Sequence, residues 1–154
     1  MRLWRIGSAA FPVWSGEGAR LRGGRWNRPG TPAIYAATSY ASAVLEVLVH
    51  SNIGRVSPGL RHVAVDIPDD APVDTLDRQQ VPGWDAMPPG PSCEVGDRWL
   101  RARSGLVLLV PSVVTGGFDH NAVVNPLHPA FASIVVAPEE AVFWDSRLAP
   151  PVSP

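Results

Sequence analysis

The chain has 154 residues, and its 13 basic residues, all of them arginine, face 14 acidic ones, for a formal net charge of −1. The length fits one domain, and 45% hydrophobic with 18% charged residues is ordinary globular composition, which excludes general disorder. The near-neutral charge argues against direct nucleic-acid binding, because phosphate backbones select a basic excess. The single cysteine, Cys93, cannot form an internal disulfide, so we expect a cytoplasmic location. No apolar run reaches 18 residues, and we expect no membrane association.

The first half of the chain mixes short apolar runs with turns rich in glycine and proline. Either Thr38 or Ser39 can cap a helix that runs to about His50, because both side chains accept hydrogen bonds from first-turn amides. The elements expected here are strands at 3–6, 33–37 and 61–67, an irregular loop or broken hairpin at 15–32, and a helix at 38–50.

The second half contains the longest apolar stretch, LVLLVPSVV at 106–114, which predicts a buried strand running into a loop. The other expectations are a turn-rich segment at 68–92 with a short helix at 74–80, a helix at 94–103, a polar loop at 116–129, strands at 131–136 and 142–144, and a loose tail. Two helices among short strands predict an α+β fold, with a small mixed sheet and flanking helices in a single domain.

The helix at 38–50 carries the sharpest chemical clue. Between residues 41 and 54, Glu46 is the only formally charged residue, so we expect a helix buried on most faces. A buried carboxylate must be hydrogen-bonded or open onto a cleft, because burying it unpaired is costly. Glu46 is therefore either a catalytic or ligand-binding group at a pocket wall, or a carboxylate at a solvent-exposed gap.

The segment RLRGGRWNRPG at 20–30 combines the adjacent Gly23 and Gly24 with four arginines. Glycines let a backbone approach a ligand closely, and guanidinium groups match phosphate or carboxylate geometry. Trp26 adds a flat apolar surface. The spacing matches neither the P-loop nor the dinucleotide fingerprint, so a phosphate would bind through another architecture. A solvated surface hairpin is the alternative.

Three further polar residues are candidate ligand contacts, and each of them could instead have a purely structural role. Tyr35 lies in the apolar strand at 33–37 and suits the core as well as a ligand. Ser112 ends the apolar run at 106–114, where sheet proteins place ligand contacts, but no nucleophile elbow surrounds it. Asn125 lies in NPLHP, a segment whose two X-Pro steps indicate a mainly structural role. Asn125 itself is still a candidate ligand contact.

Metal binding is not expected, because the four histidines and Cys93 show no ligand spacing. Of the six tryptophans, we expect Trp84, Trp99 and Trp144 to fill the core.

Taken in order, GGRWNRPGTPAIYAA, AVLEVLVH, VPSVV and NPLHP resemble the RES-domain family, small bacterial toxins named for arginine, glutamate and serine. The resemblance extends from LWRI at 3–6 to FWDSRL at 143–148. It implies a RES domain over residues 1–148 followed by a flexible tail at 149–154. It also implies a fold similar to ADP-ribosyltransferases, with NAD+ as substrate and no cofactor.

By motif match, the family's arginine falls on Arg25, its tyrosine on Tyr35, its glutamate on Glu46, its serine on Ser112 and its asparagine on Asn125. The resemblance implies that Arg25 holds the pyrophosphate and that Tyr35 stacks on the nicotinamide. Ser112 and Asn125 would fix the nicotinamide amide or its ribose. Glu46 would stabilise the oxocarbenium-like charge of glycosidic cleavage.

The resemblance further implies a toxin of a type II toxin–antitoxin system that depletes NAD+ by hydrolysis or phosphorolysis. Its partner would be a cognate Xre-type antitoxin, which would cover the arginine-lined pocket and make any DNA contact. Two other hypotheses stay open, a mono-ADP-ribosyltransferase acting on a host metabolic protein and a non-catalytic NAD-binding module. The residue two positions before Glu46 is Val44, so no second acidic residue is placed to activate a protein acceptor.

Overall fold

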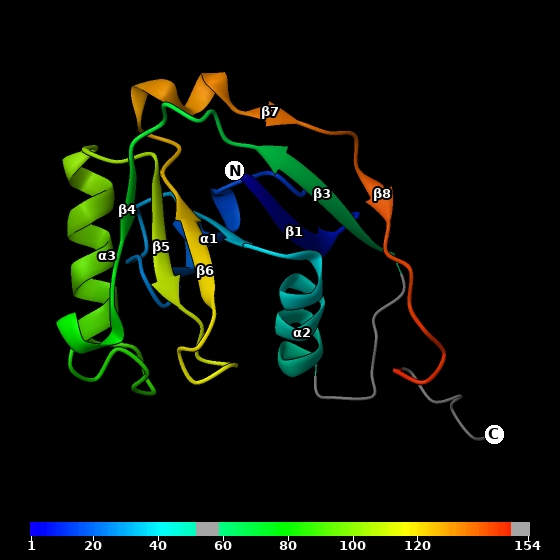
Figure 1. The fold of residues 1–154 in the computed structure, drawn as a ribbon, viewed down its shortest axis with the longest axis horizontal. Helices are drawn as coiled ribbons and strands as arrows, with labels where there is room; N and C mark the ends of the chain where they lie inside the picture. Colours follow the sequence, from blue (N-terminus) through cyan, green and yellow to red (C-terminus); the bar gives the residue numbers. More distant parts are fainter. Residues whose placement is uncertain (52–58, 149–154) are drawn as a thin grey trace.

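A computed structural model describes residues 1–51 and 59–148 of the chain (Figure 1). Its helices are α1 (Glu17–Arg22), α2 (Tyr40–His50) and α3 (Pro91–Ala102), with 3-10 turns η1 (Arg78–Gln80) and η2 (Pro129–Ser133). Its strands are β1 (Arg2–Ser8), β2 (Ile34–Ala37), β3 (Leu60–Asp66), β4 (Val73–Thr75), β5 (Val107–Pro111), β6 (His120–Val124), β7 (Val135–Val136) and β8 (Glu140–Ala141). The predicted tail at 149–154 lies outside the described residues.

The strands form one mixed sheet in the order β4-β5-β6-β2-β1-β3-β7, with β8 pairing with β3 beside β7. Strands β4 and β5 run parallel, and the other pairs are antiparallel. Helix α3 flanks the β4–β5–β6 end of the sheet, and α2 packs on β1 and β2 (Figure 1). The predicted α+β fold with a mixed sheet and flanking helices is confirmed.

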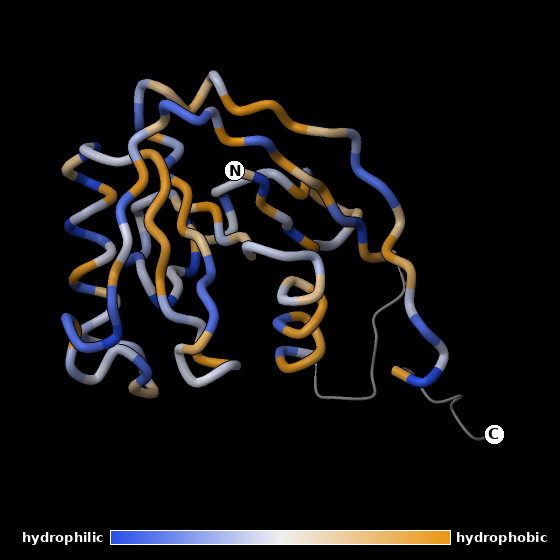
Figure 2. Tube along the Cα trace, in the orientation of Figure 1, coloured by the Kyte–Doolittle hydropathy of each residue, from blue (hydrophilic) through white to orange (hydrophobic). Residues whose placement is uncertain are grey.

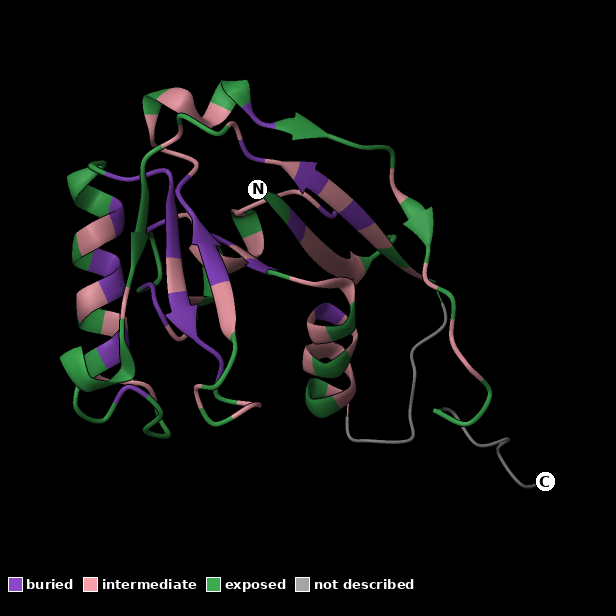
Figure 3. Cartoon of the chain, in the orientation of Figure 1, coloured by how far each residue is buried: buried purple, intermediate pink, exposed green. Residues whose placement is uncertain are grey.

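The central strands are buried on both faces, which explains their unbroken apolar sequences (Figure 3). Alternate residues of β5 and β6 belong to two separate clusters. Val107 and Val124 join the cluster built on Leu3, Val63 and Ile34, whereas Leu108 and Val123 join the one under α3. Figure 2 shows the apolar stretch along β5 and β6 at the centre of the fold.

Helix α2 begins as predicted, because the Ser39 side chain accepts a hydrogen bond from the backbone N–H of Ser42 at 3.0 Å. The expectation that this helix is buried on most faces is wrong. Only Ala43 is buried, and Leu45 and Val49 are 40% and 44% exposed. A single side of the helix packs on the sheet, so Glu46 lies at a boundary rather than in a core.

Helix α3 covers the second cluster through a close contact with the arginine-rich segment. Gly96 lies against the backbone of Trp26, where a Cβ would collide with it. The helix starts at Pro91, three residues before the predicted position, and ends where Arg103 adopts the left-handed conformation at φ 54°.

Several sequence predictions are wrong. The polar loop at 116–129 contains β6, the segment 74–80 holds β4 and η1, and the loop at 15–32 contains α1. The strand expected at 131–136 is mostly η2, and β8 replaces the strand at 142–144. Short strands with mixed polarity take their structure from their partners, so periodicity alone misses them.

The tryptophans divide differently from the prediction. Trp84 is buried as expected, and Trp99 packs only partly buried against the second cluster. Trp144 belongs to neither cluster, whereas Trp26, which was expected to offer a flat surface, is 2% exposed and central to the second cluster. No helix within residues 1–51 and 59–148 is long and apolar enough to span a membrane.

Candidate active site

A cavity of about 630 Å³ opens where α1 and the following loop face α2 across the sheet. Apolar residues form most of its lining, and many of them come from β1, β2, α2 and β5. Its charged residues, together with the one histidine, are Arg5, Arg22, Arg25, Glu46 and His50. Three guanidinium groups around one carboxylate give the cavity a positive field, which suits an anionic ligand.

Glu46 is held at the wall of this cavity by two hydrogen bonds to one of its oxygens. Ser112 Oγ donates to Glu46 Oε1 at 3.0 Å, and Asn121 Nδ2 donates to the same oxygen at 2.6 Å. The other oxygen, Oε2, lies 3.9 Å from His50 Nδ1. The carboxylate is thus fixed through Oε1, and Glu46, with its side chain 25% exposed, lines the cavity.

Arg25 also lines the cavity and is anchored to Trp84 and the turn that follows it. Its guanidinium donates to the carbonyl oxygens of Trp84 at 2.9 Å and Ala86 at 3.0 Å, and approaches Met87 Sδ at 2.9 Å. These contacts fix the plane of the guanidinium. A part of its donor capacity therefore serves the protein itself.

Arg5 reaches the cavity from β1 and is half-buried, with its Nε enclosed by the protein. One of its terminal nitrogens donates to the carbonyl oxygen of Tyr35 at 2.9 Å, while Nε has no partner among the described residues. Burial lowers the pKa of Arg5 below its ordinary value. A cation with an enclosed, unpaired N–H favours an anionic or carbonyl oxygen nearby.

Tyr35 uses its hydroxyl within the protein. The hydroxyl donates to Asn27 Oδ1 at 2.7 Å and accepts from the backbone N–H of Trp26 at 2.9 Å. Burial raises the pKa of Tyr35. Gly24 lies against the ring, where a Cβ would meet the Tyr35 oxygen at 2.6 Å, so glycine is required there.

The segment between α1 and β2 is locked from within by Asn27, which is 1% exposed. Its amide nitrogen donates to the carbonyl oxygens of Ala19 and Thr31, both at 2.9 Å. Because Tyr35 binds the amide oxygen, the side chains of the sheet and this segment form one connected network.

The structure separates the predicted site residues into two groups. Arg25, Tyr35 and Glu46 line the cavity, and Ser112, at 3% exposure, acts on it only through Glu46. Asn125 does not line it. Its fully buried amide donates to the carbonyl oxygen of Leu100 and accepts from the N–H of Leu127, so the structure gives it a structural role instead of the expected ligand contact.

Sequence reasoning missed Asn121, because residues 116–129 were assigned to a loop. In the structure, Asn121 lies on β6 and lines the cavity beside Glu46. The short apolar run AVV at 122–124, before the NPLHP turn, was the available signal for a strand, in which Asn121 and Val123 point to one face.

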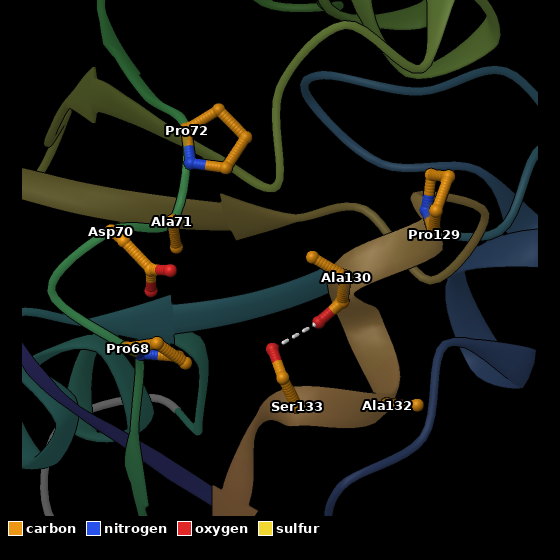
Figure 4. Close-up of a pocket in the computed structure, with 8 residues that line it drawn as sticks. All are labelled: Pro68, Asp70, Ala71, Pro72, Pro129, Ala130, Ala132 and Ser133. Carbon is orange, nitrogen blue, oxygen red and sulfur yellow. Dashed lines mark hydrogen bonds between the residues drawn. The ribbon is translucent and has the colours of Figure 1, made fainter.

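A second hollow, of about 540 Å³, lies between residues 68–72 and η2 (Figure 4). Proline and alanine make up most of its lining, and the hydroxyl of Ser133 donates to the carbonyl oxygen of Ala130. Asp70 is its one charged residue. It lacks converging polar groups, so the chemistry gathers in the first cavity. Within the described ranges, no three His, Cys, Asp or Glu side chains are grouped to hold a metal ion.

Comparison with known proteins gives one family for nearly the whole chain. The model of the RES domain matches residues 2–145. The chain is 35% identical to "Toxin Res" of Photorhabdus laumondii over 96% of this chain and 97% of that protein. It is 38% identical to "Toxin Res" of Pseudomonas putida, over 96% and 99%. It is 35% identical to the "Prs ADP-ribosylating toxin" of a Sphingobium species, over 94% of each.

A solved structure shares the fold. The match is to a crystal structure of the M. tuberculosis MbcT–MbcA toxin–antitoxin complex, with a TM-score of 0.71 and 23% identity, over 90% of this chain and 82% of the matched chain. The family match, the three relatives and this common fold agree, and the chain belongs to the RES domain family.

Proposed function

We propose that the chain is the toxin of a toxin–antitoxin system, and that it binds NAD+ in the arginine-lined cavity and cleaves its nicotinamide N-glycosidic bond. The observation that carries the proposal is Glu46, a carboxylate fixed by Ser112 and Asn121 at the wall of a cavity that also holds three arginines. The names of the relatives, "Toxin Res", support the toxin role.

The chemistry of glycosidic cleavage calls for such a carboxylate. When the bond between ribose C1′ and the nicotinamide nitrogen breaks, the electron pair leaves with nicotinamide and positive charge develops on the ribose. Glu46 Oε2 stabilises that charge or accepts a hydrogen bond from a ribose hydroxyl, while Oε1 stays bound to its two donors. Water or phosphate then captures the ribosyl carbon.

The arginines supply the binding half of the site. Arg22 ends α1, Arg25 lies in the loop after it, and both line the cavity that Glu46 also lines, so they would hold the pyrophosphate. The ring of Tyr35 also lines the cavity, although its hydroxyl is turned to Asn27. Tyr35 therefore contributes a ring surface to the nicotinamide rather than a proton donor.

Transfer of ADP-ribose to a protein is the second candidate. It is favoured by one relative, the "Prs ADP-ribosylating toxin", which is 35% identical over nearly the full length. Against it, Val44 occupies the position two residues before Glu46, where a second acidic residue would activate a protein acceptor. Both candidates use the same bond cleavage and differ in the acceptor.

An antitoxin partner is the remaining part of the proposal. The fold neighbour was solved as a toxin–antitoxin complex, which supports a partner protein for this chain. We propose that an Xre-type antitoxin covers the cavity mouth in the cytoplasm and so blocks entry of NAD+. Addition of one equivalent should abolish NAD+ turnover, and full turnover in the complex would contradict this mode of inhibition.

Product analysis of adenine-labelled NAD+ identifies the acceptor. With the purified chain alone, free ADP-ribose indicates hydrolysis, and a phosphorylated ADP-ribose that forms only in phosphate buffer indicates phosphorolysis. Label on protein, which appears only after cell lysate is added, would favour the transferase. Intact NAD+ under all three conditions, from a chain that is folded and binds NAD+, would contradict the proposed cleavage.

A further inference from the structure

Asn121 is the polar member of a row of residues that crosses the sheet beneath the cavity. Trp4 pairs with Ala37, Ala37 pairs with Asn121, and Asn121 pairs with Val110. Directly opposed residues of antiparallel strands lie on the same face, and all four residues line the cavity. An asparagine among a tryptophan, an alanine and a valine therefore faces the space where a ligand would lie.

The orientation of the Asn121 amide is fixed by its neighbour. Glu46 Oε1 can only accept, so the amide nitrogen must face it, as the 2.6 Å contact from Nδ2 shows. The amide oxygen Oδ1 is consequently directed elsewhere. It is buried and has no hydrogen-bond partner among the described residues.

An unpartnered buried acceptor needs an explanation, because such atoms are rare and cost free energy. Exchange of the two amide ends would place an oxygen against Glu46 and is excluded by repulsion between two acceptors. No described residue supplies the donor, and Asn121 itself lines the cavity beside Glu46. A ligand that carries an N–H or O–H donor and lies next to Glu46 would supply the missing partner.

We propose that Asn121 acts with both ends of its amide, positioning Glu46 through Nδ2 and accepting a hydrogen bond from the substrate through Oδ1. The inference rests on the proposed function. It assigns the donor to the nicotinamide–ribose half of NAD+, because that half contains the glycosidic bond whose cleavage Glu46 would assist. Two groups there carry a suitable donor, the carboxamide N–H of nicotinamide and the hydroxyls of the ribose.

The test measures NAD+ binding in the Glu46→Gln background, where cleavage is suppressed and the dissociation constant can be determined by calorimetry. Adding Asn121→Ala removes the acceptor and should weaken binding by about 10-fold, the usual scale for one lost hydrogen bond. Adding Asn121→Asp instead keeps an oxygen at Oδ1, and its carboxylate accepts from the side-chain amide that Glu46→Gln introduces. This second double variant should bind NAD+ within about 3-fold of its parent.

An analogue identifies the donor. In 3-acetylpyridine adenine dinucleotide a methyl group replaces the carboxamide nitrogen. If the carboxamide is the donor, the Glu46→Gln chain binds the analogue about 10-fold more weakly than NAD+, and Asn121→Ala causes no further loss. If a ribose hydroxyl is the donor, Asn121→Ala weakens binding of both dinucleotides equally. Either result supports the assignment.

Ser112→Ala is the matched control in the otherwise unchanged chain. Ser112 donates to the same Glu46 oxygen but does not line the cavity. Its loss should lower kcat and leave KM for NAD+ nearly unchanged, whereas Asn121→Ala should lower kcat and raise KM. Equal patterns in the two variants would overturn the substrate contact and leave only a positioning role.

Measurements of stability and of NAD+ binding distinguish a misfolded variant from one that has lost the substrate contact. Thermal melting establishes that each variant is folded, and Asn121→Leu, which suits the apolar row, replaces the alanine variant if that one does not fold. An unchanged NAD+ affinity in a folded Asn121→Ala or Asn121→Leu variant would overturn the Oδ1 assignment alone. Failure of the folded Glu46→Gln chain to bind NAD+ at all would overturn the proposed substrate, and the assignment with it.

Discussion

At the level of single residues, the side chains around the cavity differ in how many of their polar atoms already form hydrogen bonds within the protein. Glu46, which lines the cavity, has one oxygen bound to Ser112 and Asn121. The Tyr35 hydroxyl is fully engaged by Asn27 and Trp26. Such fixed geometry favours catalysis, because little reorganisation is needed when charge develops.

Arg25→Ala should raise KM for NAD+ by at least about 10-fold with a smaller effect on kcat, because a phosphate contact acts in the ground and transition states alike. The thermal midpoint should also fall slightly, since the guanidinium binds the carbonyl oxygens of Trp84 and Ala86. Steady-state kinetics provide the test. Arg20→Ala is the control, because Arg20 pairs with Glu17 outside the cavity. Equal KM values in both variants would remove Arg25 from the binding site.

Tyr35→Phe should destabilise the fold by about 1–3 kcal/mol, because it leaves the Trp26 N–H and Asn27 Oδ1 without a partner. NAD+ affinity should stay near that of the unmodified chain, since the ring is retained. Chemical denaturation and calorimetry measure the two quantities. Tyr40→Phe is the control, because the Tyr40 hydroxyl makes no hydrogen bond with the described residues. A stable Tyr35→Phe chain that binds NAD+ poorly would indicate that the hydroxyl contacts the ligand.

The sequence pointed to residues of the cavity better than to their arrangement. The lone carboxylate in an apolar helix and the cluster of four arginines were visible as patterns, and of these Glu46, Arg22 and Arg25 line the cavity. The roles of Ser112 and Asn125 were not, because each depends on which backbone or side chain lies opposite in the fold. Asn121 was missed for the same reason, since only pairing with β2 and β5 makes its segment a strand.

At the level of elements, α3 depends on a close approach to the arginine-rich segment. Gly96→Ala places a methyl group against the Trp26 backbone and should destabilise the chain by about 2–3 kcal/mol. Gly90→Ala, at the start of the same helix, is the control, because nothing lies within 4 Å of the added Cβ. Chemical denaturation compares the two, and similar midpoints would show that α3 does not pack as described.

Asp97 ties α3 to the same segment. It accepts from the backbone N–H of Arg28 at 3.0 Å and pairs with Arg101 at 2.9 Å. Burial acts to raise the pKa of Asp97, but a hydrogen bond from Thr31, the Arg28 N–H and the two arginine charges outweigh it and lower the pKa below 3.8. A depressed pKa means that the folded state releases this proton more readily than the unfolded state does.

The contribution of Asp97 to stability should therefore be complete above its unfolded pKa, near 3.8, and should be lost as the pH falls through the lower folded value. Asp97→Asn should lower the thermal midpoint at neutral pH, and its difference from the unmodified chain should shrink below about pH 4. Melting curves across that range provide the measurement. Asp69→Asn is the control, because that side chain is fully exposed. A difference that does not change with pH would contradict the charge-based account.

The sequence predicts helices and strands correctly where local signals are strong. It fails where a strand forms only because it pairs with a neighbouring strand. The Ser39 cap and the apolar run at 106–110 are local features, and both appear in the structure as α2 and β5. Strand β4 is only three residues long and all three are exposed, so nothing in its own sequence distinguishes it from a turn. Its parallel pairing with β5 creates it.

At the level of the whole molecule, one sheet with two cores brings distant segments to a common cavity. The arginines come from β1, α1 and the loop after it, and Glu46 comes from α2. Its donors Ser112 and Asn121 follow or lie on strands β5 and β6, more than sixty residues away in sequence. The site thus depends on the assembled fold and should be lost in any fragment that separates these segments.

Release of nicotinamide from NAD+ by the purified chain reports directly on cleavage of the N-glycosidic bond. The unmodified chain should release nicotinamide, and Glu17→Gln, which changes an exposed carboxylate outside the cavity, should match it. Glu46→Gln should bind NAD+ and release nicotinamide at least about 100-fold more slowly, the scale of losing one electrostatic group at the reacting centre. Release by Glu46→Gln at the unmodified rate would contradict the account.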